Sequence, residues 1–242
     1  MHFKISPFQM VRSLLFFLAL SLVANIKAQY HNHVWYLGFD YDPIVQFGLV
    51  SNNPTVSNGH VIPFTDESNA VATDPTTGQV LFFTNSAQVW DMSNTPMPNG
   101  AIAGATTSAS SAQLASNEAN CNQIYIFYND ANRAANTVGT LQYALVDITL
   151  PGNGSVAFPQ GDIPPGQKDI PLYNNCSEAI EIAKGPNSNR YWLYALSYDG
   201  DSLLCYSVDQ TGVNYVQGNQ LPVNLTAAFS IRHSSASNKL AI

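Results

Sequence analysis

The chain has 242 residues, of which 45% are hydrophobic and only 10% are charged, and its formal net charge at pH 7 is −7. This length suits one large domain or part of one. The acidity argues against nucleic acid as a partner, because surfaces that bind phosphates are rich in Lys and Arg. The sequence has no Gly-rich phosphate loop and no Gly-x-Ser-x-Gly motif, so it carries no local signature of nucleotide binding or of a serine hydrolase.

The first 28 residues have the pattern of a secretory signal peptide, with predicted cleavage after Ala28. Lys4 and Arg12 provide the positive start, and residues 14–23 form an apolar run that is too short to cross a bilayer. An uncleaved N-terminal membrane anchor is the alternative. Cleavage also removes Lys27, so six basic and 16 acidic residues remain and the formal charge becomes −10. We therefore predict an exported protein, secreted or held at the cell surface, with no membrane-spanning segment.

Residues 34–38 (Val-Trp-Tyr-Leu-Gly) predict a short strand that ends at a glycine. Residues 40–60 contain Pro43 and Pro54 and predict a loop with one further strand. From residue 64 onward, a pattern of apolar strand, polar turn and apolar strand occurs four times. In each copy the turn carries Gly or Asn followed by a polar residue: Gly78-Gln79, Asn122-Gln123, Asn189-Arg190 and Asn238-Lys239.

The copies recur at intervals of about 50 residues, which is typical of propeller blades. We therefore predict an all-β fold, an antiparallel β-propeller of the WD40 or YVTN type, with residues 34–38 as a possible closing strand of the last blade. Residues 151–171 are rich in Pro and Gly and predict an insertion. The predicted blades cover residues 64–105, 106–172, 173–220 and 224–242.

The fourth copy stops at Ile242, inside an apolar strand. A terminus there leaves a hydrophobic edge unpaired, which β-proteins avoid. The sequence thus predicts an incomplete propeller, the front part of a longer protein, and it leaves the total number of blades open.

Three cysteines are present, and export permits a disulfide while the odd count leaves at least one thiol over. Cys121 precedes one predicted strand and Cys176 precedes the inner strand of the next blade, so these two are the candidate pair. Cys205 is either a pairing partner or a buried free thiol. No two cysteines have the spacing of zinc ligands.

Several motifs follow one another in a fixed order along residues 34–242: residues 35–38, 74–83, 89–91, 97–100, 123–127, 141–147 and 190–193. In order and spacing they resemble the N-terminal propeller region of Bacteroidetes surface proteins that end in a gliding-motility-associated C-terminal sorting domain. The resemblance implies export through the general pathway and the type IX secretion system, and a place on the cell surface. The shared motifs are turn and packing motifs, and none of them is catalytic.

Glu67 and Glu178 occupy the same position in two copies, directly before the inner strand. With Asp66 they form either part of a carboxylate group near a central channel, which would bind a cation or sugar hydroxyls, or structural acceptors for backbone N–H groups. Tyr41, on a loop, is a further candidate because its ring would stack on a sugar. Residues 111 and 227 of the other copies are Ser and Ala, which argues against a metal ring, so no metal site or cofactor is predicted; calcium at oxygen-rich loops is left open.

These observations favour a non-enzymatic propeller module that binds or adheres to a surface polysaccharide or a protein. They predict no specific oligomer. The alternative is an extracellular hydrolase or lyase with Glu67, Glu178 and Asp66 in the propeller channel, since propellers gather polar residues from successive inner strands there. A third interpretation is a spacer without a ligand.

Overall fold

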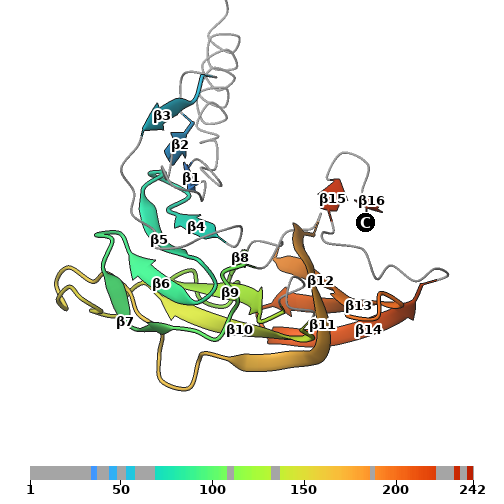
Figure 1. Cartoon of the computed structure of the whole chain (residues 1–242). Helices are drawn as coiled ribbons and strands as arrows, with labels where there is room; N and C mark the ends of the chain where they lie inside the picture. The colour runs from blue at the N-terminus through green and yellow to red at the C-terminus, as the bar shows by residue number, and fades with distance from the viewer. Residues whose placement is uncertain are drawn as a thin grey trace, which may run out of the picture.

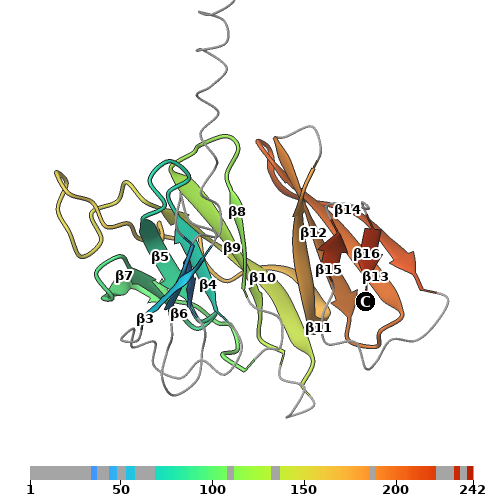
Figure 2. The same ribbon diagram turned by 90° about the horizontal axis from the view of Figure 1, so that it is seen from above.

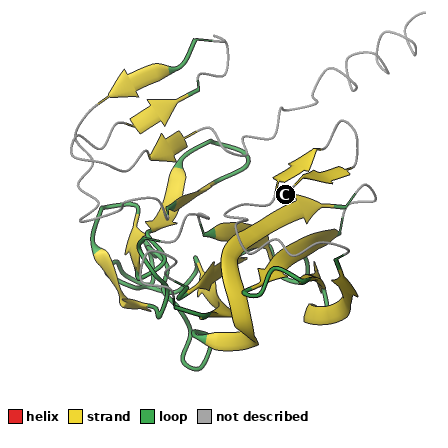
Figure 3. Cartoon of the chain, turned by 45° about the vertical axis from the view of Figure 1, so that its right-hand side comes forward, coloured by secondary structure: helices red, strands yellow, loops and turns green. Residues whose placement is uncertain are grey.

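The computed structural model describes residues 34–36, 44–47, 53–57, 69–107, 112–131, 137–185, 189–221, 232–234 and 239–241. Within these ranges the regular structure consists of sixteen β-strands in antiparallel sheets and contains no helix (Figure 3). None of the described segments is therefore a helix of the length and apolarity that a membrane crossing requires. The prediction of an all-β fold of antiparallel sheets is confirmed.

The strands follow one another in short succession. They are β1 (Val34–Tyr36), β2 (Ile44–Gln46), β3 (Thr55–Ser57), β4 (Ala70–Thr73), β5 (Val80–Thr84), β6 (Gln88–Asp91), β7 (Pro96–Ala101), β8 (Gln113–Ser116), β9 (Gln123–Asn129), β10 (Gly139–Asp147), β11 (Ile170–Lys184), β12 (Arg190–Ser197), β13 (Ser202–Asp209), β14 (Gly212–Gln220), β15 (Arg232–Ser234) and β16 (Lys239–Ala241).

Each sheet is a meander in which strands that are neighbours in sequence are also neighbours in space. The sheets have the orders β1-β2-β3, β4-β5-β6-β7, β8 to β14 in sequence, and β15-β16. In the view from above, β4–β7, β8–β10 and β11–β14 lie side by side in chain order (Figure 2). Short polar turns suffice for such connections.

Strand β11 divides the seven-stranded sheet into two repeats. Its first part pairs with β10, for example Tyr173 with Leu141, whereas its second part pairs with β12, for example Ile182 with Leu193. The register is irregular between Cys176 and Ile180, and the strand bends as it passes from one meander to the next (Figure 1). The strand is thus the fourth strand of one meander and the first strand of the following one.

The first strands of the successive meanders lie next to one another. Strand β1 contacts β4, β4 contacts β8, β8 contacts the second part of β11, and β11 contacts β15. The sheet order puts the second, third and fourth strands progressively further from this line. The protein therefore consists of meanders that meet along their first strands.

The core lies between the faces of consecutive sheets. Because side chains alternate between the two faces of a strand, one strand serves two clusters. On β9, Tyr125 and Phe127 pack with Leu193 of the following meander, whereas Ile126 and Tyr128 pack with residues of the preceding one such as Phe82. This explains why the strands read as continuous apolar runs, as expected for sheets buried on both faces.

The sheet β4–β7 is covered by β1 on the face that is turned away from β9. The ring of Phe83 stacks on Trp90 with ring centroids 5.4 Å apart, and Tyr36 meets Phe83 edge-on at 5.1 Å. Val34 completes this cluster. Aromatic pairs of this kind bury much apolar area and favour these offset geometries.

Two predictions differ from the structure: the blade boundary after residue 172 and the single strand within residues 40–60. The division at residues 172 and 173 falls inside β11, because the last strand of one repeat continues without a turn as the first strand of the next. Residues 34–36 pair with β2 and begin a sheet of their own among the described residues. The predicted loop over residues 40–60 contains two short strands, β2 and β3, rather than one.

An aspartate ends the third strand of each repeat: Asp91 in β6, Asp147 in β10 and Asp209 in β13. In all three, Oδ1 accepts the backbone N–H of the Ser or Thr two residues later, at 2.8, 2.9 and 2.9 Å. Gln123 Nε2 donates to Asp147 Oδ2 at 3.0 Å, and Arg190 Nε to Asp209 Oδ2 at 3.2 Å. The polar residues that follow the Asn turn positions therefore hold the aspartates of their own repeats.

These contacts lower the pKa of two of the aspartates. For Asp147, burial acts to raise the pKa, but hydrogen bonds from Thr149 and Gln123 outweigh it and hold the pKa below the usual 3.8. For Asp209, the hydrogen bonds from Thr211 are the main cause of a lowered pKa, and Arg190 adds to it.

A carboxyl group whose pKa is lower in the folded chain than in the unfolded chain stabilises the fold at pH values above the unfolded pKa. This contribution is lost as the pH falls through the folded pKa. We therefore expect the urea midpoint to fall when the pH drops from 7 to 3. The Asp147→Asn, Asp209→Asn double variant should show a shallower fall, and an unchanged pH dependence would contradict this assignment.

The predicted insertion docks onto the preceding repeat through polar contacts. Asp162, which is 7% exposed, accepts hydrogen bonds at 2.9 Å from the backbone N–H and the side-chain amide of Asn99 and from the backbone N–H of Ile163. Further along, Asp169 Oδ1 accepts the Ala103 N–H and the Tyr128 hydroxyl, both at 2.8 Å. The insertion thus ties β10 and β11 to the outer strand of the neighbouring meander.

Asp162→Ala should lower the free energy of unfolding by about 2 kcal/mol, because it leaves the buried N–H of Ile163 and the N–H of Asn99 without their acceptor. Urea unfolding followed by tryptophan fluorescence measures the change. Asp199→Ala is the control: Asp199 is exposed and accepts one hydrogen bond from Asn175, so its removal should change stability by less than about 0.5 kcal/mol. Equal effects of the two substitutions would contradict the role of Asp162.

Candidate functional site

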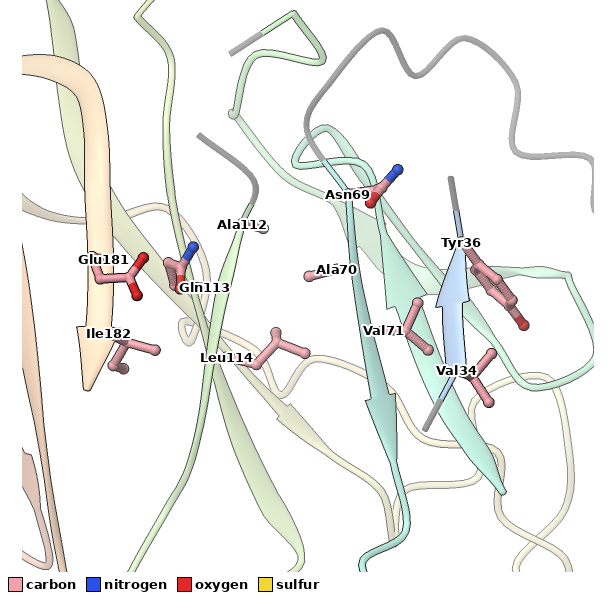
Figure 4. A pocket seen from close by; sticks show the side chains of 10 residues that line it. All are labelled: Val34, Tyr36, Asn69, Ala70, Val71, Ala112, Gln113, Leu114, Glu181 and Ile182. Carbon is pink, nitrogen blue, oxygen red and sulfur yellow. The ribbon is translucent and has the colours of Figure 1, made fainter. Parts of the chain in front are cut away.

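A hollow of about 430 Å³ lies where the first strands meet. It is bordered by β1, β4, β8 and the second part of β11, the first strands of four successive meanders that belong to three sheets (Figure 4). The residues that line it are Val34, Tyr36, Asn69, Ala70, Val71, Ala112, Gln113, Leu114, Glu181 and Ile182.

The hollow is faced by equivalent positions of three repeats. Ala70, Gln113 and Glu181 are each followed by an aliphatic residue and then by a buried alanine. They also pair with equivalent regions of the second strands, where their partners are Thr84, Phe127 and Tyr194. One position of the repeat therefore supplies three different side chains to a common space.

Three polar side chains of the strands and their starts line this space: Glu181 and Gln113 lie next to each other on β11 and β8, and Asn69 lies at the start of β4 (Figure 4). The carboxylate of Glu181 points from β11 toward Gln113 on β8 (Figure 4). Both side chains are half-buried. Among the described residues that line the hollow, Glu181 carries the only formal charge at neutral pH. A carboxylate accepts hydrogen bonds and a side-chain amide both donates and accepts, so the pair suits a ligand with hydroxyl or amine groups.

A larger cavity of about 620 Å³ adjoins the hollow at the ends of the same strands. The two cavities share the aliphatic side chains of Val71, Leu114 and Ile182. Beyond them the larger cavity is lined by polar residues of the turns, among them Asp74 and Glu118.

Lys184 and Tyr191 border the larger cavity on the side of β11 and β12. The Lys184 ammonium lies 5.4 Å from the centre of the Tyr191 ring, which is within the range of a cation–π contact. The first strands thus present an apolar band between two polar zones, and a ligand of some length would contact both.

Of the predicted site residues, the structure describes Glu178, and it does not line the hollow. Glu178 is 6% exposed, and its backbone carbonyl accepts a hydrogen bond at 3.3 Å from Asn129 Nδ2. Glu67, Asp66 and Tyr41 lie outside the described residues.

Sequence analysis overlooked Glu181 and Gln113, which line the hollow in place of Glu178. The signal that would have found them is the position before the aliphatic–alanine pair of each first strand, where the repeats carry different residues. In the part of the chain that the structure describes, no three His, Cys, Asp or Glu side chains form a group that would hold a metal ion. Calcium binding stays a prediction.

The cysteines are free thiols in the structure, and the candidate pair is not formed. Cys121 precedes the start of β9, whereas Cys176 pairs with Gly139, which lies beyond the other end of β9. The length of β9 alone separates the two ends by about 20 Å, and a disulfide needs Cα atoms within about 7 Å. Cys176 and Cys205 are buried, and burial raises the pKa of both thiols.

We expect one of the three cysteines to react rapidly with a thiol reagent such as DTNB in the native protein, because Cys121 is exposed and the other two are buried. All three should react after unfolding in urea. In Cys121→Ser the rapid phase should disappear. Two cysteines that react only after reduction would show a disulfide and contradict the free thiols.

Comparison with family models, with curated proteins and with the solved structures found no match to this chain.

Proposed function

We propose that the chain forms successive blades of a β-propeller and that the hollow along its first strands binds the ligand of an exported surface protein. Three features support the propeller. Strands β4–β7, β8–β11 and β11–β14 form three four-stranded meanders, β11 is shared between the last two, and the first strands β4, β8 and β11 are neighbours in this order. A propeller has this radial order around a central channel.

The observation that carries the binding role is the set of residues at one repeat position. Packing of the first strands is provided by the buried alanines Ala72, Ala115 and Ala183, which do not differ between repeats. The position two residues before each alanine faces the hollow with different side chains, including the half-buried carboxylate of Glu181. A carboxylate has several acceptor positions, so Glu181 can accept hydrogen bonds from a ligand that enters the hollow.

The size and polarity of the site indicate the ligand class. A volume of about 430 Å³ has room for a sugar residue or a side chain of a peptide. The single carboxylate and the amide favour a neutral or cationic group with hydroxyl or amine donors over an anionic one. The ligand we propose is an amino-sugar or neutral sugar unit of a surface polysaccharide.

The export and the place on a bacterial surface are proposed from residues 1–28 and from the resemblance to gliding-motility-associated proteins. The ligand site does not depend on them, because the hollow is built from β1, β4, β8 and β11 alone.

Glu181→Gln should weaken binding of amino-sugar or neutral oligosaccharides about tenfold or more, since hydrogen bonds to a charged group contribute about 1.5–3 kcal/mol. A glycan array followed by titration calorimetry on the best hits measures the affinity. Asp199→Asn, which removes a charge from an exposed turn, is the matched control and should bind like the parent.

Three outcomes would contradict the proposal. Equal affinity of the Glu181→Gln variant and the parent would show that the ligand does not bind at Glu181 in the hollow. Cleavage of a bound glycan that Glu181→Gln abolishes would favour the hydrolase or lyase alternative. A parent that binds no glycan on the array would favour a spacer.

A further inference from the structure

The insertion between β10 and β11 presents two large apolar side chains to solvent. Val156 is 88% exposed and Phe158 is 81% exposed. Both lie near the tip of the loop formed by residues 151–161, and this loop contains no charged residue. Single exposed apolar residues are common on proteins, but two such residues on one loop need an explanation.

The tip is closed by its own backbone. The N–H of Ser155 donates to the carbonyl of Phe158 at 3.1 Å, and the N–H of Phe158 donates to the carbonyl of Ser155, also at 3.1 Å. The N–H of Gly154 donates to the carbonyl of Pro151 at 2.8 Å. A Cβ at Gly154 would come within 2.2 Å of the Phe158 carbonyl oxygen, so the glycine permits this close approach. The conformation that exposes Phe158 is therefore built into the loop.

The base of the loop is fixed to the preceding meander. Asn153 Nδ2 donates to Asp91 Oδ2 and to the Pro96 carbonyl, both at 2.8 Å, and Gln160 Nε2 donates to Ser93 Oγ at 2.8 Å. These side-chain hydrogen bonds hold the loop on the turn that follows β6.

We propose that this loop docks a partner protein through Phe158, with Val156 two residues before it, into an uncharged apolar recess of that partner. A loop backbone held in its binding conformation before contact loses little entropy on binding. Aromatic residues with an apolar surround are the usual energetic centres of interfaces. The small patch fits a transient contact rather than an obligate one.

The charges favour a protein over a membrane as the occupant. Binding to an anionic bilayer is strengthened by Lys and Arg next to the inserting side chains. The loop has none, and the nearby Lys168 ammonium is engaged by the carbonyls of Asn99 and Ala101 at 3.4 and 3.0 Å. The net charge of −7 repels the chain from such a surface.

The test places the photoreactive amino acid p-benzoyl-L-phenylalanine at position 158 in the full-length protein, in the cells that produce it. We expect an adduct with one other polypeptide. Tyr215, which is 59% exposed on β14, is the matched position that should give no such adduct. The adduct at position 158 should persist in the Glu181→Gln variant, which separates this surface from the ligand hollow.

The cross-linked partner, purified on its own, should bind the protein at least tenfold more weakly when Phe158→Ser is introduced, and normally with Tyr215→Ser. The melting temperature of the Phe158→Ser variant should equal that of the parent, because the side chain is exposed. The proposal is overturned if no adduct forms, if the adduct is with lipid or a second copy of the chain, if position 215 gives the same adduct, or if Phe158→Ser leaves the affinity unchanged.

Discussion

Face-to-face packing of consecutive sheets is the constraint on which the rest of the molecule depends. Each central strand must satisfy two apolar clusters, one on each side, and β9 does so by alternating Tyr125 and Phe127 with Ile126 and Tyr128. A shift of one residue in register would exchange the two sets and misplace every side chain of both clusters. Each meander is therefore stabilised by its neighbours, as in other repeat proteins.

The same constraint shapes the proposed ligand site. The packed faces bring the first strands together, and small buried residues such as Ala72 and Ala115 let them approach closely. The hollow is lined by the position two residues before each buried alanine, which is occupied by Ala70, Gln113 and Glu181. A change at this position alters the chemistry of the hollow while the alanines and the clusters stay as they are.

The insertion of residues 151–169 is attached by different forces. It is linked to the sheet β4–β7 and the residues after it mainly by hydrogen bonds of Asn153, Asp162 and Asp169. Ile163 adds an apolar contact, because it belongs to the same buried cluster as Phe82. Hydrogen bonds fix direction as well as distance, so a loop without regular structure is held in one conformation. This is how an apolar tip remains exposed on a fold that buries most of its large apolar side chains.

The sequence by itself determined the features that depend on neighbouring residues. Alternation and β-forming residues predicted most of the strands, and the turn from Asp74 to Gly78 could be read directly. Asp74 Oδ1 accepts the N–H groups of Thr76 and Thr77, and Gly78 has a φ of 72° that favours glycine. The repeated turn positions likewise located the polar side chains of Gln123 and Arg190, which hold the aspartates of two repeats.

Only the tertiary structure decided the features that depend on which strands meet. The irregular register between Cys176 and Ile180 lets β11 pair first with β10 and then with β12, so a predicted blade boundary fell inside one strand. The hollow is lined by Glu181 and not by Glu178, and the ends of β9 keep Cys121 and Cys176 apart. Which strands pair, and which side chains point into a common space, depends on segments that are far apart in the sequence. A local pattern of residues predicts a strand but does not specify its partners.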